Sequence, residues 1–174
     1  MWNMIYGLVA RMANWPVLAL LFVIFLLCIS GFEQRRKAIG DTLESSIWYT
    51  PDKASKVLQA MGEHGRNIYA ITEITLDLIF PFLYGGLFAI LLFHVYGREK
   101  AGWVLLIPLI AIVADLLENF TAAYLAWSFD GRPCQLAWAA TTFTIVKTAM
   151  FLLSLVLILA GAVRLIVTTD NVSG

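Results

Sequence analysis

Two acidic residues, Glu73 and Asp77, lie four positions apart in a stretch whose other residues are largely apolar. On a helix, residues at this spacing share one face, and Tyr69 and Tyr84 extend that face in both directions. Pro81 has no backbone N–H, so the carbonyl of Asp77 loses its helical partner. An acid near a bilayer centre costs about 2.5–3.5 kcal/mol on insertion scales. The pattern therefore predicts a polar site within a membrane.

Two later apolar segments carry further polar side chains. Asp115, Glu118 and Asn119 occupy positions i, i+3 and i+4, which lie on one side of a helix. Lys147 lies in the last apolar segment, with Thr144 in the same arc. A helix that faces only lipid has no use for such a stripe, so we expect these side chains to face the protein interior.

The ionisable side chains of these three segments lie at similar depths in the membrane. Counted from the end of each apolar segment at 1.5 Å per residue, Asp77 and Glu118 lie about 13 Å inside the membrane. On the same count Lys147 lies about 16 Å deep and Asp115 about 18 Å deep. Helices that run in alternating directions thus place their charges at one level. The sequence predicts that these charges form a single cluster.

The predicted cluster contains more acids than bases. Glu73, Asp77, Asp115 and Glu118 stand against Lys147 alone. Such an excess is unfavourable at low dielectric, so some carboxylates keep protons, or a metal ion or a protonated amine lies among them. These possibilities remain open. The simpler alternative is that the polar groups only join the helices through hydrogen bonds. Five ionisable groups at one depth are more than joining the helices requires, so we favour a functional site.

Composition places the chain in the membrane. Its 174 residues are 60% hydrophobic, and charged residues make up 14%, against about a quarter in typical soluble domains. The formal net charge is zero, which argues against a nucleic-acid partner. We expect membrane lipids to be its surroundings.

The apolar segments predict an all-α fold, a four-helix transmembrane bundle in one domain over residues 1–174. The expected spans cover about 15–31, 67–96, 103–127 and 136–167. Pro81 and Gly85–Gly86 are expected to interrupt the second span, a short polar loop should cover 97–102, and Arg35–Lys37 should sit among lipid headgroups. Short connections after the second and third spans make neighbouring helices antiparallel.

The long polar segment over residues 32–66 holds a further helix. Thr50–Asp52 is a helix start, with a capping hydroxyl followed by proline and an acid. Apolar residues at helical spacing follow, which predicts a short amphipathic helix over about 51–61 between spans 1 and 2. It is expected to pack on the end of the bundle or in the interface, and the alternative is a lid. The compartment that this loop faces is left open by the basic residues.

Three segments carry a resemblance to known proteins. Thr75–Pro81, Asp115–Asn119 and Tyr49–Pro51 together resemble a group of uncharacterised bacterial four-span integral membrane proteins. The resemblance implies a multi-pass protein, expected in the bacterial inner membrane, and implies no activity. Emopamil-binding and sigma-2-type proteins are similar in architecture only, as four-helix bundles with acids in a lipid-accessible cavity. The acid pairs are also similar to those of intramembrane prenyltransferases, which have more spans and a different spacing.

We expect the site to bind a small amphipathic or lipid-like molecule, including a cationic one. Asp77 and Glu118 would serve as an acid–base pair, and Lys147 would orient the polar head. Tyr69 and Glu73 would line the entrance, and Asp115 and Asn119 would hold the pair in place. The expected ligand-binding residues are Tyr69, Glu73, Tyr84, Asp115, Asn119, Thr144 and Lys147.

Two alternatives belong to other classes of protein. The first is a proton- or cation-coupled transporter or channel subunit, which would need a homo-oligomer and a polar path to both faces. The apolar halves at 87–92, 105–113 and 152–160 argue against such a path. The second is a non-catalytic subunit of a membrane complex. The sequence contains no phosphate-binding glycine loop, nucleophile elbow or zinc-ligand pattern, so it specifies neither a cofactor nor an enzyme class.

Overall fold

The computed structural model describes residues 2–170, and every regular element in this range is helical. The all-α fold predicted from the sequence is confirmed. The elements in chain order are α1 (Trp2–Met12), α2 (Trp15–Ile39), the short 3₁₀ helix η1 (Leu43–Ser45), α3 (Pro51–Glu73), α4 (Leu76–Val104), α5 (Leu106–Trp127) and α6 (Ala137–Asp170).

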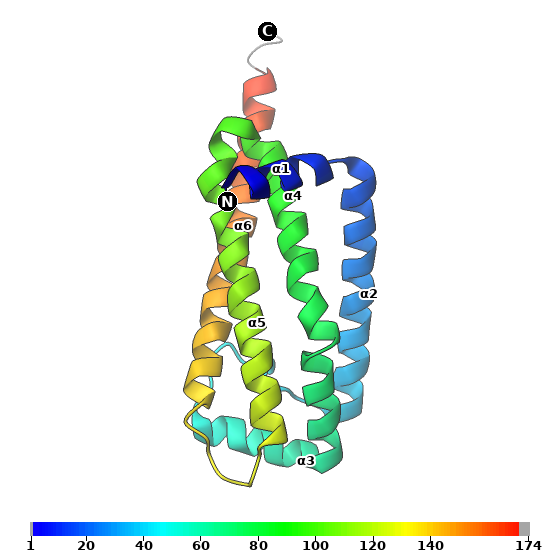
Figure 1. Ribbon diagram of the computed structural model, residues 1–174, viewed down its shortest axis with the longest axis vertical. Coiled ribbons are helices and arrows are strands. Elements are labelled where there is room, and N and C mark those ends of the chain that lie inside the picture. Colours follow the sequence, from blue (N-terminus) through cyan, green and yellow to red (C-terminus); the bar gives the residue numbers. More distant parts are fainter. Residues whose placement is uncertain (1, 171–174) are drawn as a thin grey trace.

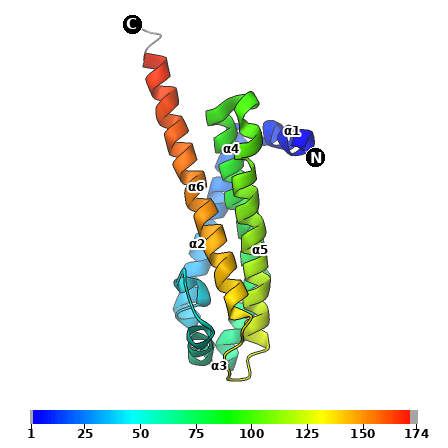
Figure 2. The ribbon, with the colours of Figure 1, turned by 90° about the vertical axis from the view of Figure 1, so that its left-hand side faces the viewer.

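Four helical segments of the described chain are long and apolar enough to cross a membrane, which makes this a multi-pass membrane protein. The segments are Trp15–Ile39, Pro51–Tyr96, Gly102–Trp127 and Ala137–Leu165. Figure 1 shows α2, α4, α5 and α6 running along one axis, with α1 across one end and part of α3 across the other. In the view of Figure 2, α6 lies beside α5 and extends past it toward the C-terminus. Helix α2 packs mainly against α4, whereas α6 packs against α5 and α4.

Helix α3 bends at Gly62, whose φ of 66° is the left-handed conformation that glycine adopts without strain. Thr50 caps its start, since the hydroxyl accepts a hydrogen bond from the backbone N–H of Lys53 at 3.3 Å. The segment before the bend lies across the end of the bundle (Figure 1). There Ala54 and Leu58 are buried against the end of α5 and the start of α6. The segment therefore packs on the bundle end, in a core built largely of alanines.

The second membrane crossing is interrupted at a different place from the one expected. The helical pattern breaks at Ile74 and Thr75, and α4 then runs through Pro81 without ending. The hydroxyl of Thr75 donates to the carbonyl of Ile71 at 2.6 Å, which supplies one backbone group at the break with a partner. The break separates Glu73, the last residue of α3, from Asp77, in the first turn of α4.

Two expected loops are helical. Helix α4 continues to Val104, so the polar residues of 97–102 lie within a helix, and only Leu105 separates α4 from α5. Helix α2 continues past residue 31 to Ile39. Glu33 stabilises this extension through ion pairs with Arg36 at 3.1 Å and Lys37 at 3.9 Å. The extension carries Arg35 into the bundle, where its side chain is 11% exposed, whereas Arg36 and Lys37 are exposed.

Candidate functional site

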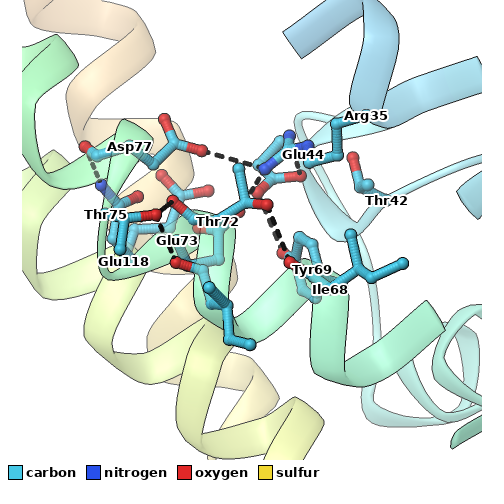
Figure 3. Close-up of polar contacts among 12 residues, drawn as sticks. Arg35, Thr42, Glu44, Ile68, Tyr69, Thr72, Glu73, Thr75, Asp77 and Glu118 are labelled. Atoms are coloured by element: carbon cyan, nitrogen blue, oxygen red, sulfur yellow. Dashed lines mark hydrogen bonds and ion pairs between the residues drawn. The ribbon is translucent and has the colours of Figure 1, made fainter. Parts of the chain in front are cut away.

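One half of the polar site is centred on Arg35 of α2 (Figure 3). Its Nη1 donates to Glu73 Oε1 at 2.7 Å and to Asp77 Oδ2 at 3.1 Å, so one guanidinium bridges the break between α3 and α4. Its Nη2 lies 3.8 Å from Glu44 Oε2. The guanidinium carbon also lies 5.5 Å from the ring centroid of Tyr69, within cation–π range. Arg35 thereby attaches α2 to the rest of the bundle.

Glu44 belongs to this half although it comes from the loop after α2. The 3₁₀ turn η1 begins after Thr42, whose backbone N–H donates to the hydroxyl of Ser45 at 3.0 Å. Glu44 Oε1 accepts a hydrogen bond from the hydroxyl of Tyr69 at 2.9 Å. Burial acts to raise the pKa of Glu44, but hydrogen bonding by the Glu73 carboxyl and then the positive charge of Arg35 outweigh burial and lower this pKa to about 2. Glu44 is therefore ionised at neutral pH.

The other half of the site is centred on Lys147 of α6. Its Nζ lies 3.0 Å from Asp115 Oδ1 and 2.6 Å from Glu118 Oε2. The hydroxyl of Thr144 donates to Glu118 Oε1 at 2.7 Å, and the hydroxyl of Tyr84 donates to Asp115 Oδ2 at 3.0 Å. This network joins α4, α5 and α6.

Asn119 links α4 and α5 at the backbone carbonyl that Pro81 leaves without a helical partner. Its Nδ2 donates to the carbonyl oxygen of Asp77 at 2.7 Å. Asn119 is buried, with 1% of its surface exposed. Pro81 cannot donate a hydrogen bond to the Asp77 carbonyl, and the side-chain amide of Asn119 donates to it instead.

A pocket of about 420 Å³ lies between the two halves, among α2, α4, α5 and α6. Its charged lining comes from both halves of the site. Beside it lies an apolar groove of about 540 Å³ formed by α2, α4 and α6, which reaches Trp15 at the start of α2. We name these two spaces the head pocket and the tail groove. The charged residues that line the head pocket are Arg35, Glu44, Asp77, Asp115 and Lys147.

The candidate residues identified from the sequence all lie in one of the two halves, but not all of them reach the head pocket. Glu118 is fully buried against Lys147 and Thr144, so it is not placed to act with Asp77 on a molecule in the pocket. Tyr69 and Glu73 are also fully buried and do not line an entrance as expected. Asp77 is the member of the expected acid–base pair that lines the pocket.

Arg35 and Glu44 were not among the candidates from the sequence. The inward position of Arg35 could have been predicted, because Phe25, Phe32 and Arg35 follow one another at helical spacing along α2. Phe25 and Phe32 both pack on the ring of Phe80 in α4, so this stripe is the inward face of α2. Glu44 offers no such signal, since its position depends on the path of a loop.

The described part of the site holds five acids and two bases, which leaves three negative charges in excess when all are ionised. Carboxylate oxygens of Glu44, Glu73 and Asp77 lie within 4.8 Å of one another. The Oε2 of Glu73 is buried without a hydrogen-bond partner in the described chain. This excess makes the site receptive to a cation or to protons.

Comparison with protein-family models, with curated proteins and with solved structures gives no match for this chain.

Proposed function

We propose that this protein binds a cationic amphipathic molecule, with a protonated amine in the head pocket and an aliphatic tail in the tail groove. The observation that carries the proposal is the position of a charged pocket directly beside an apolar groove, both bordered by α2, α4 and α6. A molecule with a polar head and an apolar tail matches this pair of environments.

The charge balance supports a cationic head. Lys147 already contacts two carboxylates, and Arg35 is shared among three. One oxygen of Asp77 contacts Arg35, while its Oδ1 accepts no hydrogen bond within the described chain and Asp77 lines the pocket. An ammonium group placed against Asp77 would offset part of the negative excess and gain charge-assisted hydrogen bonds.

The tail groove supports an aliphatic chain. Its walls are almost wholly apolar, including Phe22 and Phe25 of α2 and Leu87 of α4. From Phe25 to Trp15 it follows α2 for about 15 Å, which is about half the hydrocarbon thickness of a bilayer. A single alkyl chain of one leaflet fits this length.

We place the protein in a bacterial inner membrane. Helical spans support this location, because outer-membrane proteins of bacteria are β-barrels, and the resemblance to bacterial four-span proteins is in agreement. The apolar packing of Leu92, Val104 and Leu105 beyond the site supports binding over transport, since these described side chains offer no polar group to a passing ion.

The experiment compares three probes with the same tail and different heads, namely dodecylamine, dodecanol and dodecanoate. Native mass spectrometry of the purified chain in one detergent counts bound molecules at each probe concentration. We expect dodecylamine to bind most tightly because only its head carries positive charge. Asp77→Asn should weaken amine binding by about tenfold, the loss of one charge-assisted hydrogen bond.

Asp52→Asn is the matched control, because Asp52 is exposed on α3 and does not line the head pocket. Its amine affinity should equal that of the wild-type chain. Equal affinity for the amine, the alcohol and the carboxylate, or an unchanged amine affinity in Asp77→Asn, would refute the proposal.

A further inference from the structure

Two aromatic side chains, Tyr84 and Phe151, form the boundary between the head pocket and the tail groove. They are the two described residues that line both spaces. Their ring centroids are 5.3 Å apart, with the rings in an edge-to-face arrangement. The two rings therefore form the wall that the two spaces share, and a molecule that occupies both spaces at once contacts them.

The rings of Tyr84 and Phe151 differ in the interactions that fix their positions. The hydroxyl of Tyr84 donates to Asp115, which in turn contacts Lys147, and Tyr84 is 3% exposed. Phe151 has no polar group, is only partly buried, and contacts the rings of Tyr84 and Phe88, with centroids 5.3 and 4.8 Å away. Displacing Tyr84 breaks a hydrogen bond in a buried charged network, whereas displacing Phe151 breaks ring contacts alone. Phe151 is the ring that can move.

We propose that Phe151 is a gate between the head pocket and the tail groove and that it determines which tails the protein accepts. This inference rests on the proposed function. A phenylalanine on a helix has two favourable χ1 positions, so one rotamer change moves the ring out of the passage. A short amine occupies the head pocket without this change, while a long alkyl amine requires it.

The test uses a series of linear amines, namely butylamine, octylamine and dodecylamine, titrated against the full chain in one detergent by native mass spectrometry. Each buried methylene favours binding, so the wild-type chain should prefer dodecylamine to butylamine by about tenfold or more. Phe151→Ala opens the passage and should increase this preference. Phe151→Trp fills the passage and should remove the preference for the long tail.

Phe120→Trp is the matched control, because Phe120 is 55% exposed on α5 and lines neither space. It should keep the wild-type preference. A circular dichroism spectrum equal to that of the wild-type chain shows that Phe151→Trp is folded. If the wild-type chain binds amines but Phe151→Trp keeps the full preference for the long tail, the gate is refuted and the proposed function stands. If the wild-type chain binds no amine, the proposed function itself fails.

Discussion

Replacing Arg35 with methionine is the sharpest test of the polar site. Methionine keeps an unbranched apolar stem and removes the charged guanidinium. In the structure the Arg35 side chain is 11% exposed, and the Glu73 side chain that it contacts is not exposed at all. The replacement removes the base that contacts Glu44, Glu73 and Asp77, and leaves these three acids clustered. Removing one partner from a buried ion pair costs about 3–5 kcal/mol, and we expect a loss of this size in the free energy of unfolding.

The assay is reversible unfolding by dodecyl sulfate in mixed micelles, followed by circular dichroism. Arg36→Met is the matched control, since it removes the same side chain one position along. Arg36 is 64% exposed and pairs with Glu33, which is 45% exposed, so solvent screens the pair and its loss should have little effect. The comparison separates the loss of a buried partner from the general effect of removing an arginine from α2.

A second substitution tests why Arg35→Met loses stability. If the cost of Arg35→Met comes from uncompensated negative charge, Glu73→Gln should stabilise the Arg35→Met chain more than it changes the wild-type chain. The reasoning is refuted if Arg35→Met destabilises no more than Arg36→Met. It is equally refuted if Glu73→Gln has the same effect in both backgrounds.

Three further predictions concern single contacts. Asn119→Ala leaves the carbonyl of Asp77 buried without a partner and should cost about 1–3 kcal/mol in the same unfolding assay. The pKa of Glu44 is lowered from 4.5 to about 2, so its contribution to stability is complete above pH 4.5 and is lost as the pH falls toward 2. Melting temperatures across that pH range should therefore fall less steeply for Glu44→Gln than for the wild-type chain. A Cβ at Gly85 would lie 2.6 Å from Ile112 Cγ1, so Gly85→Val should push α4 from α5 and cost about 1–3 kcal/mol.

Each of these predictions has a control. Thr121→Ala removes an exposed hydroxyl on α5 and should be milder than Asn119→Ala. Glu63→Gln removes an exposed acid and should leave the acid-side melting curve as steep as in the wild-type chain. Gly102→Val places the same side chain in open space within α4 and isolates the clash expected at Gly85. A variant that behaves like its control contradicts the corresponding prediction.

The fold class and many residues of the polar site could be predicted from the order of the residues alone. Runs of apolar residues long enough to span a bilayer leave few folds other than a helical bundle, because every backbone polar group must be satisfied within the lipid. Helical periodicity and depth also placed the acids of α5 near Lys147, where the structure brings them into contact. The unpaired carbonyl of Asp77 could also be predicted, because Pro81 lacks the N–H that would bond it and this effect is local to one helical turn.

The pairing of the charges, and which of them reach the head pocket, depend on how the helices pack. Arg35 reaches Glu73 and Asp77 from 38 and 42 positions away in the chain, and Glu44 arrives on a loop. Glu118 proved to be buried behind Lys147, although its spacing from Asp115 gives both residues the same helical face. Helical spacing fixes the face on which a side chain lies, but the packing of neighbouring helices decides which partner it meets and whether space remains beside it.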